Sequence, residues 1–263
     1  MLRLPHSRPL ESIIPSVEAD PELGAAAEKP SVVRVSVAPK KVADEEDPRL
    51  RWAFVRKVYA ILALQFAFTA GISAVACLVR AIPRFFLTSS VASWSVYITI
   101  LLAPFLVMWP MLKYRQKHPV NLLMLALFTL CISLSVAVAS STIAGRVVLQ
   151  AAILTAVAVV GLTLFTFWAA NRGYDFTFML PFLFTSLLVL LAYLLIQMFV
   201  PLGRVGVTIY GCLATVLFSA FIVFDTNMLV KHHTYNEYVV AAISLYLDVI
   251  NLFMAQLSFS AIQ

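Results

Sequence analysis

The feature that most constrains this chain is the spacing of its charged residues. Beyond residue 57 the charges leave seven long stretches without any, which are 58–79, 85–112, 119–145, 147–171, 176–203, 205–224 and 238–247. The last two each stop at an aspartate, and continuing them to Val230 and Gln263 gives every stretch at least about 20 residues, enough to cross a hydrocarbon core of about 30 Å. The sequence therefore predicts an all-α bundle of seven membrane-spanning helices. A β-barrel is not expected, because the stretches lack alternating polarity.

Composition agrees with this reading. The chain is 62% hydrophobic and 12% charged, whereas soluble domains are roughly 45–50% apolar. Cys77, Cys131 and Cys212 all lie within apolar stretches and show neither C-x-x-C nor zinc-site spacing, so we expect small core residues. The net charge of +6 comes from basic residues scattered among short loops, so no nucleic-acid partner is expected.

Residues 1–48 differ from the rest. They are rich in Pro, Ala, Glu and Lys, and they end in the acidic run 44–47. Such a segment buries too little apolar surface to offset the entropy of ordering, so we predict a disordered cytosolic tail followed by a membrane domain over 49–263. Prolines and acids interrupt the first 20 residues, which argues against a secretory signal peptide.

Basic residues in the loops indicate the orientation. If the N-terminus is cytosolic, the cytosolic side carries Arg49, Arg51, Arg56, Lys57, Lys113, Arg115, Lys117, Arg172 and Lys231. The far side carries Arg80, Arg84, Arg146 and Arg204. This bias favours a cytosolic N-terminus. The alternative, an even helix count with both ends cytosolic, requires one re-entrant segment.

Two acids lie inside the predicted helices. Of the 13 Asp and Glu residues, nine lie in the tail, and Asp175 and Glu237 lie in short loops, which leaves Asp225 and Asp248. A carboxylate inside a bilayer is costly and marks a functional site by default. The loop joining the two helices is short, so they should pack as antiparallel neighbours with both acids in the cytosolic half.

If the two carboxyl groups meet, they cannot both ionise comfortably, so the pair shares a proton and titrates in two steps. We therefore predict that Asp225 and Asp248 form a proton-sensing, gating pair. When doubly charged, the same residues are candidate ligands for Ca²⁺, which prefers carboxylate and carbonyl oxygens. The structural alternative is that each Asp only caps a helix break or bonds a nearby hydroxyl or backbone group.

Other polar residues give weaker signals. His232 and His233 are expected in a solvated loop, although a pH sensor or metal ligand there stays open. In the segment NRGYDF, Gly173 suits a tight bend and Arg172 suits a local ion pair with Asp175.

Six segments between Leu50 and Phe253 carry a family resemblance, and they are LRWAFVRKVYAILALQ, QKHPVNLLMLALFT, VLQAAILTAVAVVGLTLFTFWAANRGYDFTFMLPFLF, IYGCLA, FIVFDT and AAISLYLDVINLF. In this order they resemble the Bax inhibitor motif family, specifically its plant lifeguard branch. The resemblance implies seven helices with the last one surrounded by the others. It also implies suppression of programmed cell death and a pH-sensitive Ca²⁺ leak from intracellular stores. The family's hydrogen-bonded aspartate pair maps onto Asp225 and Asp248.

The chain departs from the family pattern at two points. Asn227 stands where plant relatives usually have a further Asp, so a third acid at the cytosolic mouth is in doubt. The intramembrane Arg that pairs with the acids in some relatives has no clear counterpart, and Lys113 and Arg115 are nearby but unassigned.

The sequence is compatible with three kinds of function. The leading one is a Ca²⁺ leak in an endomembrane (endoplasmic reticulum, Golgi or vacuole) or in the plasma membrane, with the lipid bilayer and Ca²⁺ as partners and no cofactor. The second is a non-conducting protein that acts through membrane partners, with small residues such as Gly71, Ser73 and Gly161 at helix contacts. The third is an intramembrane aspartyl protease; its G-x-G and P-A-L motifs are missing here, so we do not expect an enzyme.

Overall fold

The computed structural model describes residues 48–88, 90–114, 119–200 and 203–261. The predicted tail lies outside this part except for Pro48, where the first helix begins. All regular structure in the described ranges is helical. The α-helices are α1 (Pro48–Leu78), α2 (Ala81–Leu87), α3 (Val91–Tyr114), α4 (Val120–Ser141), α5 (Gly145–Asn171), α6 (Leu180–Phe199), α7 (Gly203–Lys231) and α8 (Tyr238–Ser260), with short 3₁₀ helices η2 (Thr177–Met179) and η3 (Tyr235–Glu237).

Seven of these helices are long and apolar enough to cross a membrane, namely α1 and α3 to α8. This confirms the predicted all-α, seven-span architecture. Pro104 and Pro110 lie inside α3, and Pro181 lies in the first turn of α6, where a missing backbone N–H costs least.

The short helix α2 was not predicted. The uncharged stretch 85–112 suggested one continuous helix, whereas the structure ends α2 at Leu87 and begins α3 at Val91. Ser90 explains where α3 begins, because its hydroxyl accepts a hydrogen bond of 3.1 Å from the backbone N–H of Ser93 and so caps the new helix. Seven residues are too few to span a bilayer, so α2 is a connecting element.

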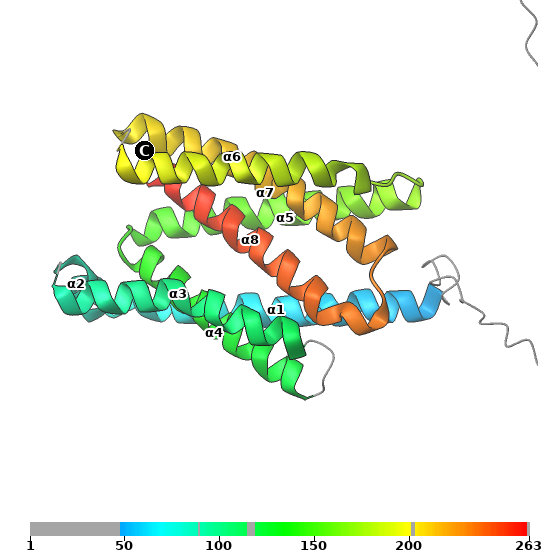
Figure 1. Ribbon diagram of the computed structural model, residues 1–263, viewed down its shortest axis with the longest axis horizontal. Coiled ribbons are helices and arrows are strands. Elements are labelled where there is room, and N and C mark those ends of the chain that lie inside the picture. The colour runs from blue at the N-terminus through cyan, green and yellow to red at the C-terminus, as the bar shows by residue number, and fades with distance from the viewer. Residues whose placement is uncertain (1–47, 89, 115–118, 201–202, 262–263) are drawn as a thin grey trace, which may run out of the picture. The chain divides into compact units, whose positions relative to one another are not determined.

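Helix α8 is the centre of the bundle. In Figure 1 it runs between a group formed by α1, α3 and α4 and a group formed by α5, α6 and α7. Of its most apolar 18-residue window, 56% is buried, compared with 11% for each of α3, α5 and α6. The last helix is therefore surrounded by the others, as the family resemblance implies.

The closest helix packing occurs between α7 and α8. A Cβ atom at Gly211 would lie 3.2 Å from Cβ of Phe259 and 3.3 Å from the carbonyl oxygen of Ala255. Small residues allow such close approach between membrane helices. Gly71 and Gly161, which the sequence suggested for helix contacts within the bundle or with a partner, have no described atom within 4 Å of the equivalent position, so they make no such contact within the bundle.

The cysteines agree only in part with their predicted core positions. Cys77 and Cys131 are partly buried, but Cys212 is exposed on α7. The prediction was wrong for Cys212 because hydropathy alone does not distinguish a side chain that faces protein from one that faces lipid.

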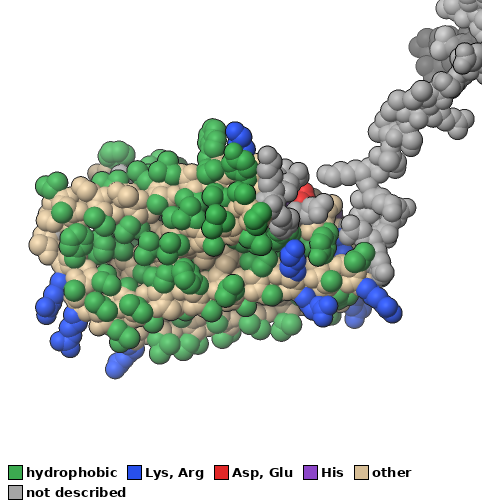
Figure 2. Space-filling model, turned by 90° about the horizontal axis from the view of Figure 1, so that it is seen from below, with side chains coloured by type: hydrophobic (Ala, Val, Ile, Leu, Met, Phe, Trp, Pro, Cys, Tyr) green, Lys and Arg blue, Asp and Glu red, His purple; other side chains and the backbone are tan. Residues whose placement is uncertain are grey.

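The two ends of the bundle differ in charge. We call them the Lys231 end, where α7 ends and α8 begins, and the Arg204 end, where α7 begins. Figure 2 shows hydrophobic side chains over the body of the bundle and basic side chains at both ends, with acidic side chains visible only toward the Lys231 end. This pattern is typical of a protein whose middle contacts hydrocarbon.

We predict that Gly211→Leu destabilises the bundle by about 1–3 kcal/mol, because the added side chain cannot fit between α7 and α8. Thermal unfolding in detergent measures the change. Gly161→Leu is the matched control, since it adds the same side chain to a helix position with open space around it. Equal effects of the two substitutions would contradict the prediction.

Candidate functional site

The structure brings Asp225 and Asp248 together. Asp225 lies on α7 nearly two turns before Lys231, and Asp248 lies on α8 nearly three turns after Tyr238. The Asp225 carboxyl group is within hydrogen-bonding reach of the Asp248 carboxyl group and of the Ser244 hydroxyl. The two residues that the charge pattern singled out are therefore in contact at the α7–α8 interface.

The Asp225–Asp248 pair lies in a buried environment. Asp248 is only 7% exposed, and its buried Oδ2 atom has no hydrogen-bond partner among the residues that the structure describes. Ionised carboxylates only accept hydrogen bonds, so a bond between the two side chains requires a proton on one of them. Two carboxylates this close in a low dielectric would repel each other.

The turn between α7 and α8 is fixed by a capping box. The Glu237 side chain accepts a hydrogen bond of 3.0 Å from the backbone N–H of Thr234, while the Thr234 side chain caps the first turn after it. This bond is the main reason that the pKa of Glu237 lies below its usual range. His233 Nδ1 is 3.5 Å from the Glu237 carboxylate. The short, ordered turn determines how α8 returns alongside α7.

The sequence did not predict an acid-centred cluster at the Lys231 end. Asp175 Oδ1 accepts hydrogen bonds from the Thr177 hydroxyl at 2.6 Å, the Thr177 backbone N–H at 3.0 Å and the Asn227 amide at 2.8 Å. His232 Nε2 lies 3.1 Å from Oδ2. The Thr177 hydroxyl is the largest cause, ahead of Asn227 and His232, of a pKa of Asp175 well below its usual range. The cluster ties the loop before α6 to the end of α7.

Two expectations for these residues change. The predicted local pair of Arg172 with Asp175 is wrong. Asp175 binds Asn227 of α7 and His232 just after that helix, while the Arg172 guanidinium lies 5.7 Å from the Trp168 ring centre. His232 contacts Asp175, so it is not simply a solvated loop residue. Gly173 has φ of 88° and makes the bend, as expected.

Asn227 now has a role. It is fully buried on α7, and its amide is the donor to Asp175. An aspartate at this position would place a second carboxylate against that of Asp175. Where plant relatives usually have a third acid, this chain therefore has an amide that donates a hydrogen bond to Asp175.

Arg51 contacts the end of α7 from α1. Its Nε donates to the carbonyl oxygen of Val230, and its Nη1 lies 3.5 Å from the carbonyl oxygen of His233. A cation at a helix C-terminus is favourable because the last carbonyl groups have no partner within the helix. Lys113, by contrast, is exposed at the end of α3, and Arg115 lies outside the described residues.

The opposite face of α8 is bound to α1, and α1 is bound to α4, by buried polar side chains. The Thr69 hydroxyl is 2.8 Å from both the Ser133 hydroxyl and the Tyr246 hydroxyl, and Gln65 donates to Thr129 at 2.8 Å. Hydrogen bonds between membrane helices contribute about 0.6 kcal/mol each on average. The face of α8 away from Asp225 is thus specifically anchored.

These features define a multi-pass membrane protein with seven spans, a central last helix and a buried carboxyl pair. The chain belongs to the Bax inhibitor family: residues 51–263 match the family described as "Inhibitor of apoptosis-promoting Bax1". The predicted family is therefore confirmed.

Relatives come from plants, animals and viruses. The chain is 50% identical over 213 residues to Protein LIFEGUARD 4 of Arabidopsis thaliana, covering 81% of this chain and 86% of that protein. It is 36% identical over 210 residues to Protein lifeguard 4 of Mus musculus, covering 80% and 85%. It is 34% identical over 205 residues to the Golgi anti-apoptotic protein of Vaccinia virus (strain Lister), covering 78% and 83%. The plant proteins place the chain in the lifeguard branch.

Asp175→Asn should lower thermal stability at neutral pH, because the hydrogen bonds around Asp175 favour its charged form. A pKa that is lower in the folded state adds stability above the unfolded value, about 3.9, and this contribution is lost as the pH falls below that value. The difference in unfolding midpoint between wild type and variant should therefore shrink below about pH 4. Arg172→Gln is the control and should change little. An equal loss of thermal stability in Asp175→Asn and Arg172→Gln would instead support an ion pair between Arg172 and Asp175.

Proposed function

We propose that this chain suppresses programmed cell death by providing a proton-regulated Ca²⁺ leak in an endomembrane. The observation that carries the proposal is the contact between Asp225 and Asp248 at the interface of α7 with the central helix. Family membership and the anti-apoptotic name of the viral relative support the cell-death role. The family is one of membrane regulators, so no catalytic role is proposed.

The gating step is a change in how α7 packs on α8. With one proton, the pair is a hydrogen bond that joins the two helices; without a proton, the carboxylates repel each other and favour separation. The two states differ in proton content, so pH shifts their populations. Because Thr69 of α1 binds Tyr246 on the other face of α8, the motion falls on α7.

Ca²⁺ is the proposed substrate of this leak. Carboxylate and hydroxyl oxygens are available from Asp225, Asp248 and Ser244. Ca²⁺ takes six to eight oxygen ligands, and the described residues contain no cluster of three or more His, Cys, Asp or Glu side chains. A Ca²⁺ ion held by these two acids would take its remaining ligands from water, and such incomplete coordination by the protein suits an ion that passes through and is released.

The proposed topology has a cytosolic N-terminus and therefore places the Lys231 end in the cytosol. The distribution of basic residues over the loops supports this orientation. Residence in an endomembrane is supported by the Golgi name of the viral relative.

The test is Ca²⁺ flux into liposomes that contain the purified full-length protein, measured as a function of pH. Asp225→Asn and Asp248→Asn should each abolish the pH dependence, because an amide cannot lose the proton that the pair shares. Glu237→Gln is the matched control, because it neutralises an acid in the turn between α7 and α8 that lies outside the Asp225–Asp248 pair. Glutamine can also form the capping box, so this variant should keep the wild-type pH profile of Ca²⁺ flux. Identical profiles for wild type and both Asp variants would contradict the gating role.

A survival assay separates conduction from partner binding. Cells under stress of the endoplasmic reticulum should lose protection when they express Asp225→Asn or Asp248→Asn in place of wild type, provided that membrane levels match. Full protection by variants that lack regulated flux would instead favour the non-conducting protein that acts through membrane partners.

A further inference from the structure

Helix α7 is held on two sides near the Lys231 end. Asp225 contacts the Asp248 carboxyl group of α8. Asn227 follows two residues later and so lies about 200° further round the helix. Its amide donates to Asp175 Oδ1 at 2.8 Å, in the loop between α5 and η2. The acid pair and this hydrogen bond therefore lie on nearly opposite faces of the same turn of α7.

Two further contacts join the same loop to the end of α7. The Lys231 ammonium group donates to the carbonyl oxygen of Tyr174 at 2.6 Å, and His232 Nε2 is 3.1 Å from Asp175 Oδ2. Both contacts are exposed, so water competes with them. Asn227, by contrast, is fully buried, and a hydrogen bond to a carboxylate is stronger than one between neutral groups. The Asn227–Asp175 bond is therefore the main tie between the loop and α7.

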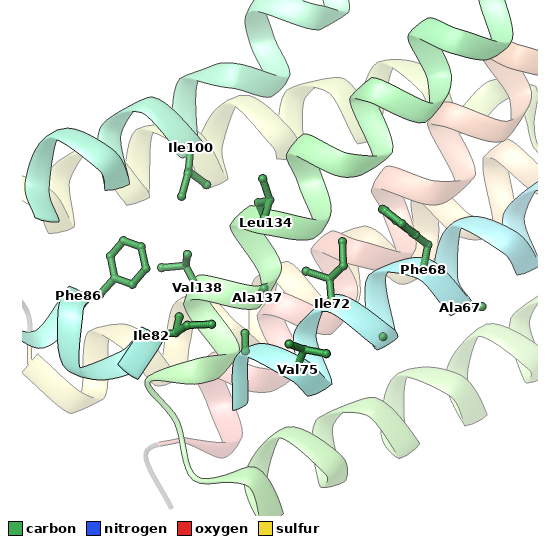
Figure 3. Close-up of a pocket in the computed structure, with 12 residues that line it drawn as sticks. Ala67, Phe68, Ile72, Val75, Ile82, Phe86, Ile100, Leu134, Ala137 and Val138 are labelled. Carbon is green, nitrogen blue, oxygen red and sulfur yellow. The ribbon is translucent and has the colours of Figure 1, made fainter. Parts of the chain in front are cut away.

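The bundle leaves space beside the turn that carries Asp225. A pocket of about 280 Å³ lies between α1, α5, α7 and α8, and its lining includes Ile222, Leu245 and Val249, all within one turn of Asp225 or Asp248. Protein interiors are close-packed, so a helix shifts most readily where such space exists. The apolar groove of about 560 Å³ in Figure 3 is lined by α1 to α4 and gives α7 no such room. Helix α7 thus has space to change its packing on α8.

We propose that Asp175 and Asn227 are positioning residues for the gate, whose hydrogen bond holds α7 in the packing that keeps Asp225 against Asp248. The inference rests on the proposed Ca²⁺ leak and assigns its regulation to the loop between α5 and η2. For α7 to move relative to α8, the bond must break or the loop must move with the helix. The strength of the bond therefore sets the fraction of molecules in which the gate is open.

Exchanging the two side chains tests the proposal in the full-length protein, with Ca²⁺ flux into liposomes measured at one pH. Asp175→Asn removes the carboxylate, and Asn227→Asp places a second carboxylate against the first. Each should raise the flux about tenfold or more, because a hydrogen bond to a charged group changes an equilibrium by at least about that factor. The double variant exchanges amide and carboxylate and re-forms the bond, so its flux should return to within about twofold of wild type.

A flux that stays high in the double variant would overturn the proposal, because the acid at position 227, and not the lost bond, would then be the cause. Hydrogen exchange followed by mass spectrometry gives a second readout, which does not depend on conduction. Backbone amides over 226–231 should exchange faster in each single variant and regain wild-type protection in the double variant. Faster exchange with unchanged flux would show a tie that only stabilises the fold, and would also overturn the positioning role.

Thr129→Val is the matched control, since it removes a buried hydrogen bond of 2.8 Å from Gln65 that joins α1 to α4 and leaves α7 untouched. It should change neither the flux nor the exchange over 226–231. Wild-type flux in both single variants, with the pH dependence of flux lost in Asp225→Asn, would overturn the positioning role and leave the proposed leak standing. No flux from any form, wild type included, would remove the proposed leak, and the exchange measurement would then decide whether the bond positions α7.

Discussion

The bilayer withholds water from the backbone, and most of this structure follows from that constraint. Every peptide group in hydrocarbon must find its partner within the protein, which leaves helices as the elements that cross. Helices then associate through packing and polar contacts, since lipid is as apolar as their own side chains. The close approach at Gly211 and the hydroxyl contacts of Thr69 are the two forms that this association takes around α8.

The number of spans could be predicted because the cost of a charge in hydrocarbon is large and acts residue by residue. The break between α2 and α3 could not, because no charge marks it; a serine cap and the short length of α2 decide it. The sequence also did not reveal which face of each helix contacts lipid, and the exposed Cys212 is an example. Uniformly apolar helices carry little periodic signal of orientation.

The identity of the site residues could be predicted from the sequence, but the way in which they contact each other could not. Counting acids isolated Asp225 and Asp248, and a short turn made their helices neighbours, but contact depends on how each helix is rotated about its axis. The Arg51 contact with Val230 joins positions 179 residues apart, and no spacing rule reaches that far. Asp175 was assigned to the nearest cation in sequence, Arg172, whereas the fold supplies better donors from α7.

The acids of the described bundle all belong to one half of it, while the Arg204 end offers arginines alone. Fixed charges arranged in this way create a potential that differs between the two faces of a membrane. Basic residues outnumber the loop acids Asp175 and Glu237 at the Lys231 end as well, so both ends carry net positive charge and only the Lys231 end adds carboxylates to it. Dissolved salt weakens the resulting repulsion of cations, because it screens the exposed lysine and arginine side chains at both ends.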